Sequence, residues 1–195
     1  LKCDIWKFFD SIDHEVLLGL IRKKICDTDT LRLLWEIVRS FETTPRMGLP
    51  LGSVTSQLFA NIYLHELDQF VKHSLRVPYY VRYCDDFVVL EHDQRKLSNI
   101  LLEIGVFLKN RLVLSFHNDK ILIRTFRQGI DFLGYVSLPY YRVLRTKTKR
   151  RMFRRVHAES FQSYCGLLTH CHGFKLRRSI EDVVVKIEKF RWAGV

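Results

Sequence analysis

Three aspartates of this sequence occupy places where a carboxylate is costly unless something compensates its charge. Asp4 lies within an apolar stretch, residues 1–6, and Asp85 and Asp86 lie between two runs rich in Tyr, Val and Phe. Clustered carboxylates repel each other, and a divalent cation bound by their oxygens removes that repulsion. A bare Asp pair is more often a simple polar turn. The surrounding sequence therefore decides between a metal site and a turn.

The elements that would position these aspartates follow from the spacing of apolar residues. Residues 1–6 are predicted to form a strand, and residues 79–90 two strands joined by a tight turn. The same reasoning predicts a helix that begins after Asp13, helices over 31–41, 53–75 and 97–108, a loop over 43–52, and β segments over 112–116, 121–126 and 130–136. The carboxylates of Asp85 and Asp86 are thus expected at the tip of a β-hairpin.

Composition narrows the class of protein. The chain has 195 residues, of which 47% are hydrophobic and 13% aromatic, so it can bury a real core and is not intrinsically disordered. No stretch reaches the ~18 uninterrupted apolar residues that crossing a bilayer requires, so we expect a soluble protein. Five scattered cysteines, an odd number, fit a reducing compartment. The first residues resemble an interior strand, and we expect a truncated protein.

Positive charge is concentrated in the last third of the chain. With 32 Lys and Arg against 21 Asp and Glu, the net charge is +11, which favours a polyanionic partner, either nucleic acid or an acidic membrane surface, and charge alone does not choose between them. Residues 142–155 hold eight basic residues and no acidic one, and the chain beyond them is predicted to be helical. A basic helix there could pack with one face and follow phosphates with the other, or be a solvated charged face. The change in composition places a domain boundary near Pro139.

Four segments stand in the order of the palm motifs of reverse transcriptases. They are DIWKFF at 4–9, GLPLGSVTSQ at 48–57, YCDD at 83–86 and GIDFLGY at 129–135. The chain therefore resembles a reverse transcriptase over nearly its whole length. The second segment carries Leu51 and Gln57 where most of these enzymes carry Gln and Pro, and in this it resembles the diversity-generating retroelement type. The enzymes of group II introns and retrons are near neighbours.

The resemblance implies an α+β fold, in which a polymerase palm with an antiparallel sheet and packed helices spans residues 1–140. A helical thumb follows over residues 141–195, and the fingers are missing. The implied activity is RNA-directed DNA synthesis, with template RNA, a primer, an RNA–DNA duplex and dNTPs as partners. In the diversity-generating family this synthesis is error-prone opposite adenine, and an accessory variability protein is a further partner. A bacterial or phage-encoded cytoplasmic protein without a membrane partner is expected.

The same resemblance assigns a metal site to the aspartates. Asp4 and Asp85 are expected to bind two Mg²⁺ ions directly, or Mn²⁺ in their place, and so to meet across adjacent strands. Asp86 is expected to tune the site as a nearby carboxylate, and the carbonyl oxygen of Ile5 to be an additional ligand. All three aspartates are the expected catalytic residues.

Further residues are assigned to the nucleotide and to the nucleic acid. Phe9 matches the ring that excludes a ribose 2′ hydroxyl, and Lys120 matches a residue near the leaving pyrophosphate. Leu51 offers no hydrogen bond, which predicts lower fidelity, and Gly52 and Gln57 belong to the same nucleotide-binding segment. The primer grip is assigned to Phe132, Leu133, Gly134 and Tyr135. The contacts to the nucleic-acid backbone are assigned to Arg145, Lys147, Lys149, Arg150, Arg151, Arg154 and Arg155.

Each assignment has a simpler alternative. Phe9 could be a core residue beside Phe8, Leu51 a packing residue of a loop, and Lys120 a solvated lysine. For the whole chain, the alternatives are a group II intron or retron reverse transcriptase, and a non-catalytic relative that binds RNA or serves in defence. The retained aspartates argue against the last, because a scaffold gains nothing from an uncompensated acidic cluster.

Overall fold

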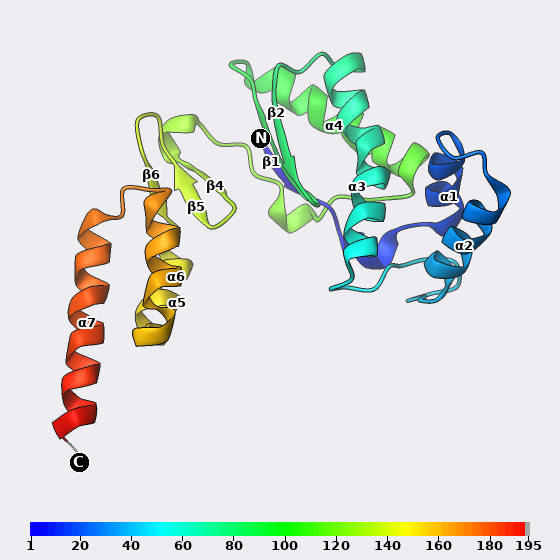
Figure 1. Ribbon diagram of the computed structural model, residues 1–195. Coiled ribbons are helices and arrows are strands. Elements are labelled where there is room, and N and C mark those ends of the chain that lie inside the picture. The colour runs from blue at the N-terminus through cyan, green and yellow to red at the C-terminus, as the bar shows by residue number, and fades with distance from the viewer. Residues whose placement is uncertain (194–195) are drawn as a thin grey trace. The chain divides into compact units, whose positions relative to one another are not determined.

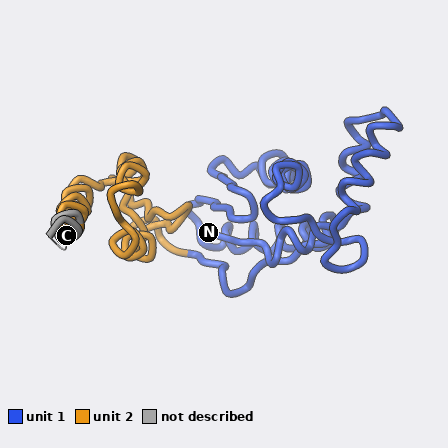
Figure 2. Tube along the Cα trace, turned by 60° about the horizontal axis from the view of Figure 1, so that its bottom comes forward, with its two compact units in different colours: residues 1–123 blue, residues 124–195 orange. Residues whose placement is uncertain are grey.

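The computed structural model of the chain describes the backbone of residues 1–193 and the side chains of residues 1–187 (Figure 1). The chain divides into two compact units, residues 1–123 and the residues from 124 onward, each with its own hydrophobic core (Figure 2). This division comes earlier than the boundary predicted near residue 140, because the strands that follow residue 129 pair with each other inside the second unit. The assignment of residues 1–140 to a palm and 141–195 to a thumb stays a prediction.

The first unit contains a three-stranded antiparallel sheet. Its strands are β1 (Lys2–Asp4), β2 (Tyr79–Tyr83) and β3 (Asp86–Leu90), and β3 lies between the other two. The predicted hairpin over residues 79–90 is confirmed, since β2 and β3 are joined by the two-residue turn of Cys84 and Asp85. The sheet thus brings the N-terminal strand beside a hairpin nearly eighty residues later in the chain.

Helices cover one face of this sheet. The helices of the first unit are α1 (His14–Arg22), α2 (Thr28–Arg39), α3 (Val54–Gln69) and α4 (Gln94–Leu112), with short helical turns η1 (Phe8–Ser11), η2 (Phe70–Ser74) and η3 (Asn118–Lys120). Figure 1 shows α3 and α4 on the same side of the strands. Tyr63 of α3 is fully buried and its hydroxyl donates to the Leu112 carbonyl at the end of α4, at 2.6 Å. This bond ties the two helices together beneath the sheet.

Two β segments predicted after α4 are wrong as strands. Over 112–116 and 121–126 the chain makes only isolated bridges, Ile5 to Phe116 and Lys2 to Leu122, and α4 itself runs to Leu112. The helix ends there because Val113 adopts a left-handed conformation, with φ of 53°. Alternation of apolar residues marks half-buried backbone, but it does not show whether a neighbouring strand supplies a continuous ladder.

The second unit joins a small sheet to helices. Strands β4 (Ile130–Phe132), β5 (Tyr135–Ser137) and β6 (Arg142–Leu144) are antiparallel in that order, and η4 (Phe126–Gln128) precedes them. They are followed by α5 (Thr146–Arg155), α6 (Ala158–Thr169) and α7 (Phe174–Ala193). Strand β6 was not predicted, because it opens the basic run. The predicted α+β class with antiparallel sheets is confirmed, and none of the described helices is long and apolar enough to span a membrane.

Candidate active site

Asp4 and Asp86 face each other across two hydrogen-bonded strands. Asp4 ends β1, Asp86 begins β3, and the two residues are direct partners in the antiparallel register. Asp85 lies one residue earlier, in the turn that joins β2 to β3. Side chains at paired positions point to the same face of a sheet, with Cβ atoms ~4.5–5.5 Å apart. The register therefore brings all three expected aspartates to one end of the sheet.

Two lysines neutralise the paired aspartates. The ammonium of Lys120 donates to both carboxylate oxygens of Asp4 at 3.0 Å, and Nζ of Lys2 lies 3.0 Å from Oδ2 of Asp86. Lys120 was assigned to the nucleotide, and here its ammonium binds a carboxylate. The sequence reasoning missed Lys2. The available signal was its place two residues before Asp4, which puts both side chains on one face of the same strand.

Burial disfavours the ionised form of the two hairpin carboxyls. Desolvation raises the pKa of Asp85 above its usual value of 3.8, and the charges of Asp4 and Asp86 raise it further. Desolvation also raises the pKa of Asp86, although Lys2 acts against the shift. Among the described residues, Oδ1 of Asp86 is buried without a hydrogen-bond partner. A buried acceptor among like charges is an atom that a cation would satisfy.

The donor set suits a divalent metal ion, although the carboxylates do not converge on one point. Within the described part of the chain, no group of three or more His, Cys, Asp or Glu side chains is placed to hold a metal ion. Asp4 and Asp86 instead each bind their own lysine. Ile5, whose carbonyl was expected as a ligand, is buried and follows Asp4 directly. Oxygen donors and the unsatisfied oxygen of Asp86 fit Mg²⁺ or Mn²⁺, and ligation itself stays a prediction.

Phe9 and the start of the glycine-containing segment are joined by backbone hydrogen bonds. The N–H of Leu49 donates to the Phe9 carbonyl at 2.8 Å, and the N–H of Gly48 donates to the Ile12 carbonyl at 2.8 Å. Nε2 of the buried His14 lies 2.7 Å from the Gly48 carbonyl oxygen. The Phe9 ring is partly buried and packs edge-to-face against the ring of Phe8, with 5.5 Å between the ring centroids. The structure therefore brings two predicted nucleotide-facing segments together.

The three assigned residues of the glycine-containing segment, Leu51, Gly52 and Gln57, are exposed. Leu51 is 77% exposed, which removes the alternative that it packs within the loop. Gly52 has a φ of 89°, a conformation that favours glycine, and leads directly into α3. Gln57, in the first turns of α3, is also exposed. The side chains of Leu51 and Gln57 and the backbone of Gly52 are thus accessible to a ligand.

The predicted primer grip is a tight hairpin in the second unit. Its turn consists of Leu133 and Gly134, both with positive φ (53° and 86°), between the partners Phe132 and Tyr135. This is the backbone of a type I′ turn, whose twist matches that of the strands. Leu133 is 47% exposed at the tip, whereas the hydroxyl of Tyr135 donates to the Leu167 carbonyl of α6 at 2.9 Å. Tyr135 therefore has a structural contact besides its predicted role.

The basic run is less uniform than its sequence indicates. Arg145 is ion-paired with Asp131, its Nε donating to Oδ1 at 2.6 Å, so the expectation of an unopposed cation is wrong at this position. The acid lies fourteen residues earlier in the chain and meets Arg145 only through the β4–β5–β6 sheet. The other assigned cations are exposed on α5, namely Lys147, Lys149, Arg150, Arg151, Arg154 and Arg155. Part of that surface is a shallow hollow of about 540 Å³ lined by Thr146, Lys149, Arg150, Phe153 and Arg154.

Known proteins resemble this chain in sequence. Residues 1–137 match the model of the family described as reverse transcriptase (RNA-dependent DNA polymerase). The chain is 27% identical to the group II intron-encoded protein LtrA of Lactococcus lactis subsp. cremoris, over 95% of this chain and 41% of that protein. It is 24% identical to protein YkfC of Escherichia coli (strain K12), over 87% of this chain and 54% of that protein. The chain is 25% identical to a putative COX1/OXI3 intron 2 protein of Saccharomyces cerevisiae, over 69% of this chain and 23% of that protein.

The fold also has a solved counterpart. It is similar to telomerase from Candida albicans, determined in complex with the TWJ fragment of telomeric RNA, with a TM-score of 0.62 at 14% identity, over 100% of this chain and 40% of that one. The chain covers 23%, 41% and 54% of the three relatives named above, so it spans at most about half of their length. The family model covers well over half of the chain and includes the three aspartates. This chain belongs to the reverse transcriptase (RNA-dependent DNA polymerase) family.

Proposed function

We propose that this chain forms the palm and thumb of an RNA-directed DNA polymerase, which extends a primer along an RNA template. The observation that carries the proposal is the register that sets Asp4 opposite Asp86, with Asp85 in the adjoining turn. These residues lie within the span that matches the family model. An RNA template is supported by the relatives named as intron-encoded proteins and by the structural neighbour solved with RNA.

Asp4, Asp85 and Asp86, with the carbonyl oxygen of Ile5, are the groups that would hold two Mg²⁺ ions, or Mn²⁺. Such ions activate an attacking hydroxyl and neutralise a triphosphate. Carboxylates whose ionised form is disfavoured by burial gain most from a bound cation. The side chain of Lys120 is 52% exposed. Its ammonium can therefore release Asp4 and bind the departing pyrophosphate without disturbing the core.

Phe9 is proposed to select dNTPs over NTPs. Its ring is held by the core on one side, and its backbone anchors the segment that leads to Leu51. A ring fixed in this way cannot move aside for a 2′ hydroxyl, so the ribonucleotide loses contact or clashes. Leu51, Gly52 and Gln57 are proposed to approach the base and sugar from the exposed side of the loop.

The second unit is proposed to hold the primer and the RNA–DNA duplex. The turn of Leu133 and Gly134 can approach a nucleic-acid strand closely, because Leu133 is exposed and Gly134 has no side chain. The exposed cations of α5 offer a phosphate-binding surface without an acidic residue in the helix.

Primer extension by the full-length protein tests the proposal. With a DNA primer on an RNA template, dNTPs and Mg²⁺, we expect incorporation that EDTA stops and that added Mg²⁺ or Mn²⁺ restores. Tight binding to the template without incorporation under any of these conditions would contradict the proposal and support the non-catalytic RNA-binding alternative.

Two finer roles extend this proposal. One relative is named as a group II intron-encoded protein and another as a putative intron 2 protein, and these names favour an intron-type enzyme, one of the alternatives given above. The diversity-generating role, with adenine-directed errors and an accessory variability protein, is the second candidate. One observation favours it: Leu51 is 77% exposed beside the Phe9 segment and offers an incoming nucleotide no polar contact.

Sequencing of cDNA separates the two roles. If Leu51 relaxes selection, the parent enzyme should misincorporate mainly opposite template adenine, and Leu51→Gln should lower that error several-fold, since one hydrogen bond is worth ~1 kcal/mol. Leu33→Gln, which adds an amide at a 58% exposed position of α2 outside the nucleotide-binding segment, is the matched control and should leave the errors unchanged. Equal and low error at all four template bases in the parent enzyme favours the intron-type role.

A further inference from the structure

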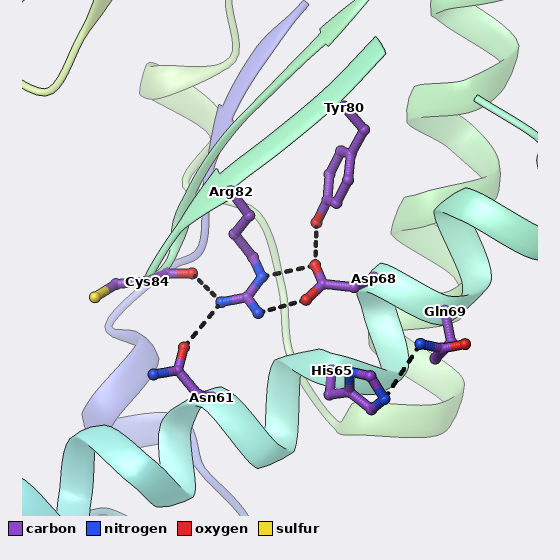
Figure 3. Close-up of polar contacts among 7 residues, drawn as sticks. All are labelled: Asn61, His65, Asp68, Gln69, Tyr80, Arg82 and Cys84. Atoms are coloured by element: carbon purple, nitrogen blue, oxygen red, sulfur yellow. Dashed lines mark hydrogen bonds and ion pairs between the residues drawn. The ribbon is translucent and has the colours of Figure 1, made fainter. Parts of the chain in front are cut away.

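The side chain of Arg82 joins helix α3 to the turn that carries Asp85. Nε and Nη2 of Arg82, on β2, donate to the two carboxylate oxygens of Asp68, on α3, at 2.8 and 2.5 Å. Nη1 of the same guanidinium donates to the carbonyl oxygen of Cys84 at 3.0 Å, and a longer contact of 3.5 Å reaches Oδ1 of Asn61. Figure 3 shows the guanidinium between the helix and the turn, with its donors aimed at both.

The pair is strongly fixed on the helix side. The side chain of Arg82 is only 10% exposed and that of Asp68 28% exposed. Burial lowers the pKa of Arg82, but the hydrogen bonds and charge of Asp68 outweigh that effect and raise it. The hydroxyl of Tyr80 donates to the same Asp68 oxygen at 2.7 Å. Asp68 thus accepts three hydrogen bonds, and a bidentate pair of this kind sets both distance and orientation.

The turn on the other side needs a restraint. Cys84 has a φ of 52°, a left-handed conformation that is unfavourable for a residue other than glycine. The next residue, Asp85, has a carboxyl that is half-buried and is repelled by the charges of Asp4 and Asp86. The backbone strain at Cys84 and the repulsion of the Asp85 carboxyl both favour a movement of the turn away from Asp4 and Asp86. The hydrogen bond from Arg82 to the Cys84 carbonyl opposes this movement at the peptide that precedes Asp85.

We propose that Asp68 and Arg82 are positioning residues that fix the orientation of the Cys84–Asp85 turn and thereby the place of the Asp85 carboxylate. This inference rests on the proposed polymerase function for its kinetic consequence, and on geometry alone for its effect on cation binding. It also accounts for two charged residues to which the sequence reasoning assigned no role. A buried Arg in a β-strand and an Asp on the facing side of a helix are costly unless they serve each other.

Arg82→Lys in the full-length protein is the central test. Lysine keeps the positive charge, but its single ammonium cannot hold a carboxylate in two places and a carbonyl at once. We expect kcat for RNA-templated extension to fall by roughly tenfold or more, because a carboxylate displaced by a fraction of an ångström is poorly aligned in the transition state. KM for dNTP should change by less than about twofold, since the nucleotide-facing residues are untouched.

Further variants grade the effect and control for stability. Asp68→Asn should behave like Arg82→Lys, and the double variant should lose little more than either single one, because the two residues act as a unit. Tyr80→Phe removes only the hydroxyl that supports Asp68, so we expect a smaller loss. Glu66→Gln breaks the ion pair of Glu66 with Lys23 at 3.3 Å, two residues earlier on the same helix, and should leave kcat unchanged. Thermal unfolding of every variant reports the fold.

Binding of Mn²⁺, followed by electron paramagnetic resonance, gives a readout that does not need polymerisation. Arg82→Lys and Asp68→Asn should bind Mn²⁺ several-fold more weakly than the parent and than Glu66→Gln. If the parent fails to extend primers, the proposed function fails, while this measurement still decides the positioning role. A folded Arg82→Lys protein with kcat and Mn²⁺ affinity within about twofold of the parent would overturn the inference. If Arg82→Lys does not fold, unchanged kcat and Mn²⁺ affinity in folded Asp68→Asn protein would overturn it equally.

Discussion

Asp85 combines two properties that work against stability, a half-buried carboxyl and neighbouring carboxyls of the same charge. Asp86 shares the burial and leaves one oxygen without a partner among the described residues. Lys2 and Lys120 form ion pairs with Asp86 and Asp4, and the charge of Lys120 also lowers the pKa of Asp85 without cancelling the effect of burial. Groups kept in unfavourable surroundings are common at functional sites, where their use lies in binding a charged ligand.

Asp85→Asn should stabilise the metal-free protein at neutral pH. The pKa of Asp85 is raised on folding, so its protonated form is favoured in the folded state, and its contribution to stability is largest below the usual pKa of 3.8 and is lost as the pH rises through the folded-state pKa. Asparagine is neutral throughout. In EDTA, urea unfolding should therefore show the variant more stable than the parent at pH 7, by ~1 kcal/mol or less because solvent screens a partly exposed carboxyl, with a smaller difference at about pH 4.

The exposed Glu103 of α4 provides the control for that measurement, since Glu103→Gln also removes one negative charge from the first unit. The unfolding free energy of Glu103→Gln should equal that of the parent at both pH values. A lower stability of Asp85→Asn than of the parent at both pH values would contradict the burial of an uncompensated carboxyl.

Phe9→Ala should admit ribonucleotides. Removal of the ring opens space for a 2′ hydroxyl, and the ratio of kcat/KM for NTP over dNTP should rise by roughly tenfold or more. Extension with each nucleotide on the same primer and template measures the ratio. A folded variant with unchanged preference would reduce Phe9 to a core residue beside Phe8, with which its ring is in edge-to-face contact.

At the scale of elements, two hairpin turns present the predicted functional residues, and both use left-handed backbone at residues other than glycine. Cys84 and Leu133 have φ values of 52° and 53°. The β2–β3 hairpin and the helix after Gly52 could be predicted from apolar spacing and turn residues, whereas β6 was missed and two predicted strands do not form. The ion pairs could not be predicted, because local sequence does not specify which distant segments meet. Lys120 of η3 reaches Asp4 between two isolated bridges to the N-terminal segment, and Arg145 reaches Asp131 through the β4–β5–β6 sheet.

Leu133→Asn should stabilise the β4–β5 turn. A type I′ turn requires positive φ at both central residues, which asparagine tolerates much better than leucine, and Leu133 buries little surface because it is 47% exposed. We expect a gain of up to ~1 kcal/mol in thermal or urea unfolding of the protein. Leu102→Asn, at a 68% exposed position in the helical backbone of α4, should instead lose stability. A loss in both variants would contradict the assignment of strain to the turn.

At the scale of the molecule, a net charge of +11 points to nucleic acid, and α5 concentrates six cations without an acidic residue. The family and the order of its motifs could be inferred from sequence because they depend on a few residues with fixed roles. The finer role stays a proposal, because it was inferred from Leu51 and Gln57, two exposed residues whose proposed effect requires a bound nucleotide.

The cations around the α5 hollow should contribute to the salt dependence of duplex binding. Replacing Lys149, Arg150 and Arg154 with Gln should reduce the slope of log K against log salt by roughly 2 to 3, because each phosphate contact releases about one counterion. Filter binding or anisotropy with an RNA–DNA duplex measures the slope. The matched control carries the same three-charge change on exposed residues of α7, at Lys175, Arg177 and Arg178. If the α5 triple variant and the α7 triple variant show equal slopes of log K against log salt, the cations of α5 form only a solvated face.

Single-turnover incorporation of one dNTP opposite an RNA template tests the central claim, that the aspartates at the end of the first sheet perform the polymerase reaction. Asp4→Asn and Asp85→Asn keep the size of each side chain and remove its charge, and we expect each to slow incorporation by roughly 100-fold or more while duplex binding is kept. Glu103→Gln should react at the parent rate. Incorporation by either Asp variant within a few-fold of the parent would contradict the account.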